Sequence, residues 1–200
     1  MSHRTRTVLL AAFVLALVGL IPASSQDKEP EPEPEMPSLL TPAHKLLASL
    51  EGKFDTASRM WMAPGAEPVA STGAVTRVSV LDGLFLRESY SVDEGQFAHK
   101  GEINWGYNTA TGKVQYVQLV STSPAMNVYE GDWDEKAKAF TVRSAYKMTW
   151  QGTEYDVKTR IVLTVESADK QKLEIFSAYE TKETKIPEYL EIEVSYTRKK

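Results

Sequence analysis

Residues 190–198 read Leu-Glu-Ile-Glu-Val-Ser-Tyr-Thr-Arg, with a large apolar side chain at every second position until the last. A period of two is typical of a β-strand that buries one face and exposes the other. The pattern assigns Ile192 to the buried face and Glu191 to the solvent face. Arg198 has the parity of the buried residues, which is an unusual place for a charge. The stretch therefore predicts a strand with one buried face, and the alternation alone leaves open whether the Arg198 side chain turns toward the core or lies in solvent.

The same alternation recurs along the chain between short turn signals such as Asp82-Gly83, Thr111-Gly112 and Gln151-Gly152. The predicted strands lie near residues 53–62, 71–81, 84–92, 96–107, 113–121, 126–133, 138–149, 153–166, 171–181 and 188–198. Tight turns between consecutive strands indicate an antiparallel meander, and a long meander avoids exposed edges by closing on itself. We therefore predict an all-β fold, a single antiparallel meander barrel of about ten strands.

One short helix is expected before the first strand. Thr41 followed by Pro42 is an N-cap signal, and three leucines then follow at helical spacing. Gly52 lies where a helix C-cap would be expected.

The start of the first strand, Gly52-Lys53-Phe54, resembles the opening of lipocalin-like (calycin) barrels. Those barrels begin with Gly-x-Trp after a short helix that closes one end, and an Arg or Lys of their last strand packs across the aromatic ring. The resemblance implies that Arg198 stacks on Phe54, because an Arg plane can lie over an aromatic face. The alternative is that Arg198 lies in solvent beyond the strand end.

A finer resemblance covers roughly residues 43–198 and is to the bacterial family called domain of unknown function 1579. It rests on the order and spacing of these pieces: His44-x-x-Leu47-x-x-Leu50-x-Gly52, Trp61-Met62-Ala63-Pro64-Gly65, Pro68, Gly73, Gly83-Leu84-Phe85-Leu86, Gly101, Gly106-Tyr107-Asn108, Gly131, Glu191-Ile192-Glu193, Tyr196 and Arg198. Two departures are Phe54, where the family tends to Trp, and Asn108, where it tends to Asp. Asn108 supplies no carboxylate, which weakens the hypothesis that its turn binds a cation. The resemblance implies a fold and no function.

The 200 residues divide into three predicted parts. Residues 1–25 resemble a secretory signal peptide, because the apolar run Val8–Ile21 follows two arginines and precedes small residues at a cleavage point between Ser25 and Gln26. An uncleaved anchor is the alternative, but a span needs about 20 apolar residues. Residues 26–37 alternate acid with proline, which predicts a disordered linker, either a stalk or a solubilising spacer. Residues 38–200 form the barrel domain, and we expect it to be secreted or periplasmic, with no membrane span after signal cleavage.

Composition excludes several classes of function. The chain has no cysteine, so disulfides, Cys-ligated metals and thiol nucleophiles are excluded. Residues 38–200 carry 20 basic and 22 acidic side chains, which argues against nucleic acid as a partner. His44 and His99 are far apart and have no acid at ligand spacing, so we expect no metal site and no cofactor. A haem site with a single histidine is the remaining cofactor alternative.

The candidate ligand-binding residues are four inward-facing aromatic residues of the middle strands and one acid of inward parity: Trp105, Tyr107, Tyr116, Tyr146 and Glu88. Such rings either wall a cavity for one small ligand or fill the core. Glu88 is either a general acid/base or half of a buried ion pair with Arg77 or Arg87. His44 is expected to cap or pack the helix, with a role as axial ligand or general base as the alternative. His99 is expected on an exposed edge beside Lys100.

These observations favour an exported barrel that binds a small, largely apolar ligand, and binding is favoured over catalysis because no catalytic motif is present. An enzyme that uses Glu88, and an envelope interaction protein with a filled barrel, are the two alternatives. The oligomeric state does not follow from the sequence.

Overall fold

The computed structural model describes residues 39–93 and 97–200. It contains one short helix followed by ten strands in chain order: α1 (Pro42–Ala48), β1 (Gly52–Met60), β2 (Val69–Val80), β3 (Phe85–Val92), β4 (His99–Asn108), β5 (Lys113–Val120), β6 (Asn127–Asp134), β7 (Ala139–Trp150), β8 (Thr153–Val165), β9 (Lys170–Glu180) and β10 (Lys185–Arg198). No helix within these residues has the length and apolar character needed to cross a bilayer. The predictions for residues 1–25 and 26–37 lie outside the described residues.

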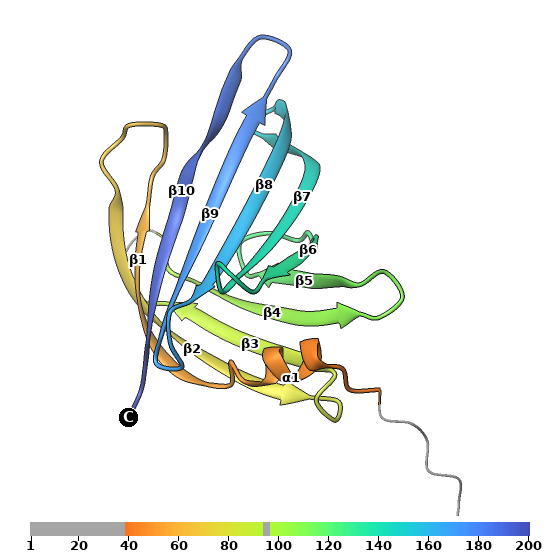
Figure 1. The fold of residues 1–200 in the computed structure, drawn as a ribbon. Coiled ribbons are helices and arrows are strands. Elements are labelled where there is room, and N and C mark those ends of the chain that lie inside the picture. Colours follow the sequence, from red (N-terminus) through yellow and green to blue (C-terminus); the bar gives the residue numbers. More distant parts are fainter. Residues whose placement is uncertain (1–38, 94–96) are drawn as a thin grey trace, which may run out of the picture. The chain divides into compact units, whose positions relative to one another are not determined.

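The ten strands form a closed antiparallel barrel in which each strand pairs with its neighbours in the chain (Figure 1). The last strand returns to the first, with Phe54 opposite Arg198 and Met60 opposite Ile192. The predicted fold class is therefore confirmed. All ten predicted strands are present, because the alternation of apolar and polar residues follows the inner and outer faces of the sheet.

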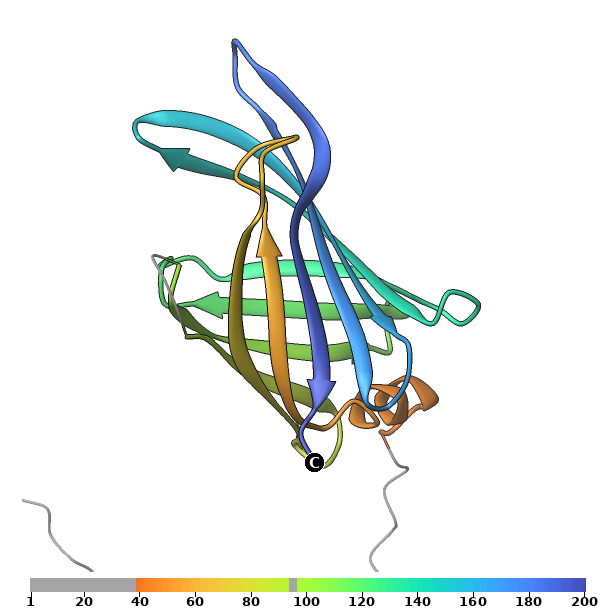
Figure 2. The same ribbon diagram turned by 90° about the vertical axis from the view of Figure 1, so that its left-hand side faces the viewer.

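Helix α1 lies at one end of the barrel and packs against β3 and β4 (Figure 2). Thr41 is its N-cap, as predicted, and His44 completes a capping box by reaching back to the Thr41 backbone. The helix ends earlier than expected, with Ser49 as C-cap. Gly52 is therefore not a helix cap but the first residue of β1, where its backbone φ is +147°.

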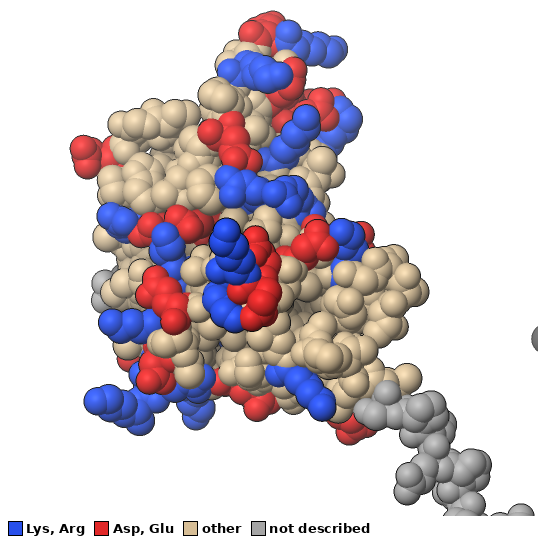
Figure 3. All heavy atoms as spheres, in the orientation of Figure 1, with Lys and Arg blue, Asp and Glu red and all other residues tan. Residues whose placement is uncertain are grey.

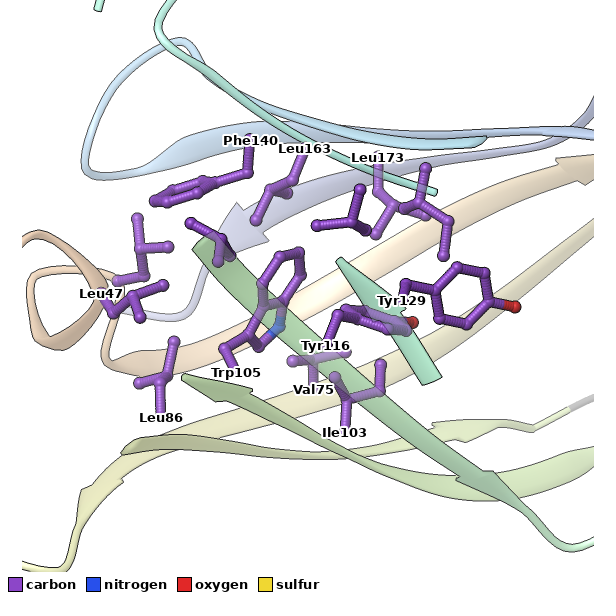
Figure 4. Packing of buried hydrophobic residues seen from close by; sticks show 14 of the residues in the cluster. Leu47, Val75, Leu86, Ile103, Trp105, Tyr116, Tyr129, Phe140, Leu163 and Leu173 are labelled. Atoms are coloured by element: carbon purple, nitrogen blue, oxygen red, sulfur yellow. The ribbon is translucent and has the colours of Figure 1, made fainter. Parts of the chain in front are cut away.

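The interior next to α1 is solidly filled. Trp105 is fully buried and packs edge-to-face on Tyr116, with ring centroids 4.7 Å apart, and Phe140 lies beside it at 5.8 Å (Figure 4). Leucines of the helix and of the strands, including Leu47 and Leu86, surround these rings. This cluster is the main hydrophobic core, and we call this half of the barrel the closed end.

The opposite half is less regular and we call it the open end. Pairing between β6 and β7 stops at Glu130 and Arg143, and residues 144–150 of β7 pair only with β8. The hairpins β7–β8 and β9–β10 extend away from α1 beyond the shorter strands (Figures 1 and 2). The β9–β10 ladder also has two register shifts, one of them between Leu190 and Ile192. Irregular pairing of this kind commonly redirects side chains near barrel rims.

The face of the domain seen in Figure 3 carries positive and negative side chains intermixed over the strands. Many are paired, such as Arg160 with Glu188 at 2.5 Å. This mixture agrees with the near-balance of charge in residues 38–200.

Candidate functional site

Where β10 pairs with β1, one aromatic ring is in contact with two guanidinium groups. Phe54 is fully buried, and the Arg198 guanidinium lies over it at 4.9 Å from the ring centroid, which confirms the stacking that the resemblance implied. Arg198 also donates to Ala168 O at 3.0 Å. A Cβ on Gly52 would collide with the Arg198 guanidinium, so glycine is needed there for space as well as for its positive φ.

A charged network occupies the interior next to this ring. Arg77 Nε donates to Glu88 Oε2 at 2.6 Å, and Arg77 also donates to the side-chain oxygen of Gln171. The Arg77 guanidinium lies over Phe54 and over Tyr196, at 5.3 and 4.7 Å. Burial alone would lower the pKa of Arg77, but its interactions with Glu88 and Tyr196 together outweigh burial and raise the pKa above its ordinary value. Glu88 is thus half of a buried ion pair with Arg77, while Arg87 is exposed on the outer face.

A cavity of about 120 Å³ lies above this network, toward the open end. Most of the surface of its wall is apolar, and the apolar residues come from β1, β2, β3, β4, β9, β10 and the β3–β4 connection: Met60, Val75, Val92, Phe97, Ile103, Leu173, Ile175, Ile192 and Val194. Polar side chains also reach it: Thr56, Ser58, Ser71, Glu88, Tyr90, Ser91, His99, Tyr116, Gln118 and Tyr196. A largely apolar wall surface interrupted by polar groups is the usual composition of a small-molecule site.

His99, Tyr90 and Gln118 form a polar group in the cavity wall. His99 Nδ1 lies 2.7 Å from the carbonyl oxygen of Phe97, and since that oxygen only accepts, Nδ1 carries the proton. A neutral ring then leaves Nε2 as an acceptor, and no partner for it is found among the described residues. Gln118 Nε2 donates to Tyr90 Oη at 3.1 Å, which leaves the Tyr90 hydroxyl proton available. The wall thus offers one acceptor and one donor in the same region, since the two rings are in edge contact at 5.6 Å.

The predicted site residues do not form one group. Glu88 and Tyr116 line the cavity. Trp105 belongs to the solid core, and its Nε1 has no hydrogen-bond partner within the described chain. Tyr107 packs on His44 near α1 at 5.7 Å, while Tyr146 lies on the part of β7 that pairs with β8 but not with β6. The alternation predicted the inward direction of these residues but not their height along the barrel axis.

The prediction for His44 is confirmed and the prediction for His99 is wrong. His44 is buried and caps the helix, accepting from Thr41 N at 3.0 Å, so the capping role is confirmed. The expectation of an exposed edge for His99 is wrong, because its ring is half-buried and lines the cavity. His99 shares its parity with Ile103 and Trp105, and that signal could have placed it inside.

Sequence reasoning also missed Glu191. The alternation predicts that it faces solvent with Glu193, but a β-bulge follows Leu190: Leu190 pairs with Phe176 and Ile192 pairs with Ile175, so Glu191 has no partner in the ladder. The extra residue brings Glu191 among inward-facing tyrosines, where Tyr179 Oη donates to Glu191 Oε1 at 2.6 Å. A bulge leaves no signature in a plain apolar–polar alternation, so only the structure reveals it.

Residues 39–93 and 97–200 contain no group of three or more His, Asp or Glu side chains placed to hold a metal ion. The buried acid Glu88 and its partner Arg77 neutralise each other's charge, although Arg77 Nη2 has no hydrogen-bond partner among the described residues. The cavity has the chemistry to hold a small molecule against apolar side chains and to form hydrogen bonds with it through His99 and Tyr90.

Comparison with known proteins identifies a family model and a solved structure that are similar to this chain. The family model described as "Protein of unknown function (DUF1579)" matches residues 40–198. Among solved structures, the chain is similar to the crystal structure of Rv2717c from M. tuberculosis, with a TM-score of 0.53 and 13% identity over 80% of this chain and 99% of that chain. At that identity the likeness shows the barrel fold alone. A search of the curated proteins found no match.

Proposed function

We propose that this chain, which belongs to the DUF1579 family through residues 40–198, binds a small and largely apolar molecule inside its lipocalin-like barrel. The cavity of about 120 Å³ is the observation that carries the proposal. Its wall combines apolar side chains with the His99–Tyr90–Gln118 group, which gives a ligand both contact area and orientation.

The size of the cavity limits the ligand. An apolar cavity of about 150 Å³ in another protein binds benzene. A cavity of about 120 Å³ therefore suits a molecule with a single ring or a short branched chain. A long fatty acid or a large dye would not fit without movement of the wall.

The polar wall selects among such molecules. His99 Nε2 accepts and the Tyr90 hydroxyl donates, so a ligand hydroxyl could satisfy both groups at once. A hydrocarbon of the same shape would leave both groups unpaired in a desolvated site, which costs free energy. We therefore expect phenol to bind more tightly than benzene.

The test is a calorimetric titration of the purified domain with phenol and with benzene. Val75→Phe adds volume inside the cavity and should abolish saturable binding, while Val78→Phe makes the same change on the outer face of the same strand, where Val78 is 38% exposed. His99→Phe should remove the preference for phenol. Absence of saturable binding of either probe to the unmodified domain, or equal binding by the Val75 and Val78 variants, would contradict the proposal.

Export remains a proposal that rests on the sequence of residues 1–25. Expression of the full chain in a bacterial host and N-terminal sequencing of the recovered protein tests it. We expect the mature chain to begin at Gln26 and to be recovered outside the cytoplasm. A cytoplasmic protein that begins at Met1 would contradict it.

The enzyme and the filled-barrel alternatives have less support. Glu88 is held by Arg77, and a carboxylate in an ion pair at 2.6 Å is a weaker general acid/base candidate than a free one. The filled-barrel alternative requires an interior without a cavity, which does not agree with the cavity that Glu88 lines.

A further inference from the structure

Glu191 is an acid without a counter-charge. It is half-buried on the inner side of β10, and no Lys or Arg of the described residues lies within ion-pair distance of its carboxylate. Glu193, two residues along the same strand, pairs on the outer face with Arg59 at 2.5 Å. The difference follows from the bulge, which separates Glu191 from the outward-facing charged residues of β10.

Tyrosine side chains surround this carboxylate. Tyr179 donates a hydrogen bond to Oε1, and its ring lies 6.3 Å from Tyr155 and 6.4 Å from Tyr189. The second oxygen, Oε2, has no hydrogen-bond partner among the described residues. The carboxylate therefore lies among aromatic rings with half of its acceptor capacity unused.

Tyr129 and Tyr146 complete the surroundings from β6 and β7, on the two sides of the interrupted ladder. Burial raises the pKa of both hydroxyls, and the negative charge of Glu191 raises both further. Burial and the same carboxylate raise the pKa of Tyr179 and of Tyr189. All four tyrosines thus lie within electrostatic reach of Glu191, and they stay neutral at physiological pH.

A carboxylate that is half-buried loses part of its hydration and is stabilised by a nearby positive charge, and aromatic faces attract cations through their negative quadrupole. We propose that Glu191 and the tyrosines around it bind an organic ammonium ion, with the cation against the rings and its charge opposite the free carboxylate oxygen. The site lies next to the cavity, because Ile192 lines the cavity and Tyr129 packs on Tyr116 at 5.2 Å. The inference does not depend on occupation of the cavity itself.

Choline and its uncharged carbon isostere, in which a tert-butyl group replaces the trimethylammonium group, are the probes. Each is titrated into the domain at constant ionic strength, and binding is followed by calorimetry and by tyrosine fluorescence. We expect saturable binding of choline and at least about tenfold weaker binding of the isostere, as for loss of a hydrogen-bonded or paired charge. Equal binding of the two probes, or no saturable binding of choline, would overturn the proposal.

Glu191→Gln keeps the shape of the side chain and removes its charge, so it should weaken choline binding by about tenfold or more. Glu193→Gln is the matched control on the outer face of the same strand and should leave the affinity unchanged. Equal affinity of these two variants would overturn the proposal.

Thermal unfolding of both variants checks that they fold. If Glu191→Gln prevents folding, Tyr179→Phe replaces it, because that change removes only the hydroxyl bound to Oε1. It should alter choline affinity, while Tyr107→Phe, which removes the hydroxyl of a tyrosine that packs on His44 near α1, is its control and should not. Equal choline affinity of the two tyrosine variants would then count against the proposal.

Val75→Phe separates this site from the cavity. It should abolish phenol binding and leave choline binding unchanged, since Val75 lines the cavity and Glu191 does not. Failure of phenol to bind any variant, with choline binding intact, would count against the proposed function and not against the ammonium site.

Discussion

The closed and open ends of the barrel hold their charged groups in opposite ways. At the closed end, Arg77 and Glu88 are fully buried and bonded to each other, in contact with Phe54 and the aromatic core. At the open end, Glu191 is half-buried and has tyrosines but, among the described residues, no cation beside it. The Arg77–Glu88 pair is charge-neutral as folded, whereas the proposed ammonium ion would supply the counter-charge that Glu191 lacks. The difference separates the part of the interior that holds a buried ion pair from the part for which we propose ligand binding.

The largest expected effect is at the closed end. Glu88→Gln leaves the Arg77 charge buried without its partner, and such losses cost about 3–5 kcal/mol of unfolding free energy. Urea denaturation followed by tryptophan fluorescence measures it. Replacing both residues with apolar side chains, as in Arg77→Met with Glu88→Leu, removes the unpaired charge and should recover most of that stability. A cost well below about 1 kcal/mol for Glu88→Gln would mean that water reaches the pair and that the closed end is not dry.

The second expected effect concerns how the closed end is sealed. Gly52→Ala places a methyl group on the Arg198 guanidinium and a side chain at φ +147°, and strain of this kind costs about 1–3 kcal/mol. The same substitution made in an Arg198→Ala background should cost less, because only the backbone strain remains. The two unfolding experiments form a double-mutant cycle, and equal costs in both backgrounds would show that Arg198 does not press on Gly52.

The third prediction concerns alkaline pH. Burial raises the pKa of Tyr116 and of Tyr196, so the folded state keeps these protons after the unfolded state has lost them. Below about pH 10 both states keep these protons, so the two tyrosines cause no pH dependence of stability. Above it the unfolded chain loses protons that the folded state retains, so the free energy of unfolding decreases by up to about 1.4 kcal/mol per pH unit for each tyrosine. Urea denaturation at a series of alkaline pH values measures the slope. Tyr116→Phe should reduce the slope, and an unchanged slope in that variant would contradict the burial argument.

The smallest effect is expected on the outer face of the open end. Glu193→Gln breaks the ion pair with Arg59, whose side chain is 55% exposed, so the cost should stay below about 1 kcal/mol and decrease with added salt. The same denaturation assay at low and high salt measures it. A cost close to that of Glu88→Gln would remove the distinction between buried and surface pairs on which the comparison of the two ends rests.

The sequence was sufficient for the fold because a barrel strand repeats its pattern with a strict period of two. The closing strand, the stack of Arg198 on Phe54 and the capping role of His44 all followed from parity, spacing or resemblance. The candidate site was predicted only in part. Trp105 and Tyr116 have the same inward parity, yet one fills the core and the other lines the cavity, because parity gives the face of the sheet and not the depth along the axis.

Glu191 shows the second limit of the pattern. Because β10 has one extra residue at the bulge, Glu191 turns to the inner side of the barrel although the adjacent Ile192 also faces inward. Nothing in the alternation of residues 190–198 marks the position of this bulge. Residues 190–198 therefore predict the strand correctly but give the wrong direction for Glu191. Its neighbours Tyr129 and Tyr146 come from strands distant in sequence, and only the three-dimensional arrangement brings them to one acid.

The closing pair of strands has a consequence for protein engineering. Strands β1 and β10 are antiparallel neighbours, and the backbone N–H of Lys199 donates to the carbonyl of Lys53 at 2.8 Å, so the end of the domain lies beside the start of its first strand. Every other pair of neighbouring strands in the barrel is consecutive in the chain and is therefore already joined by a loop. A circular permutant that joins residue 200 to residue 39 through a short flexible linker and opens the chain at an exposed turn, such as Gln151-Gly152, keeps every ladder and should fold to the same barrel.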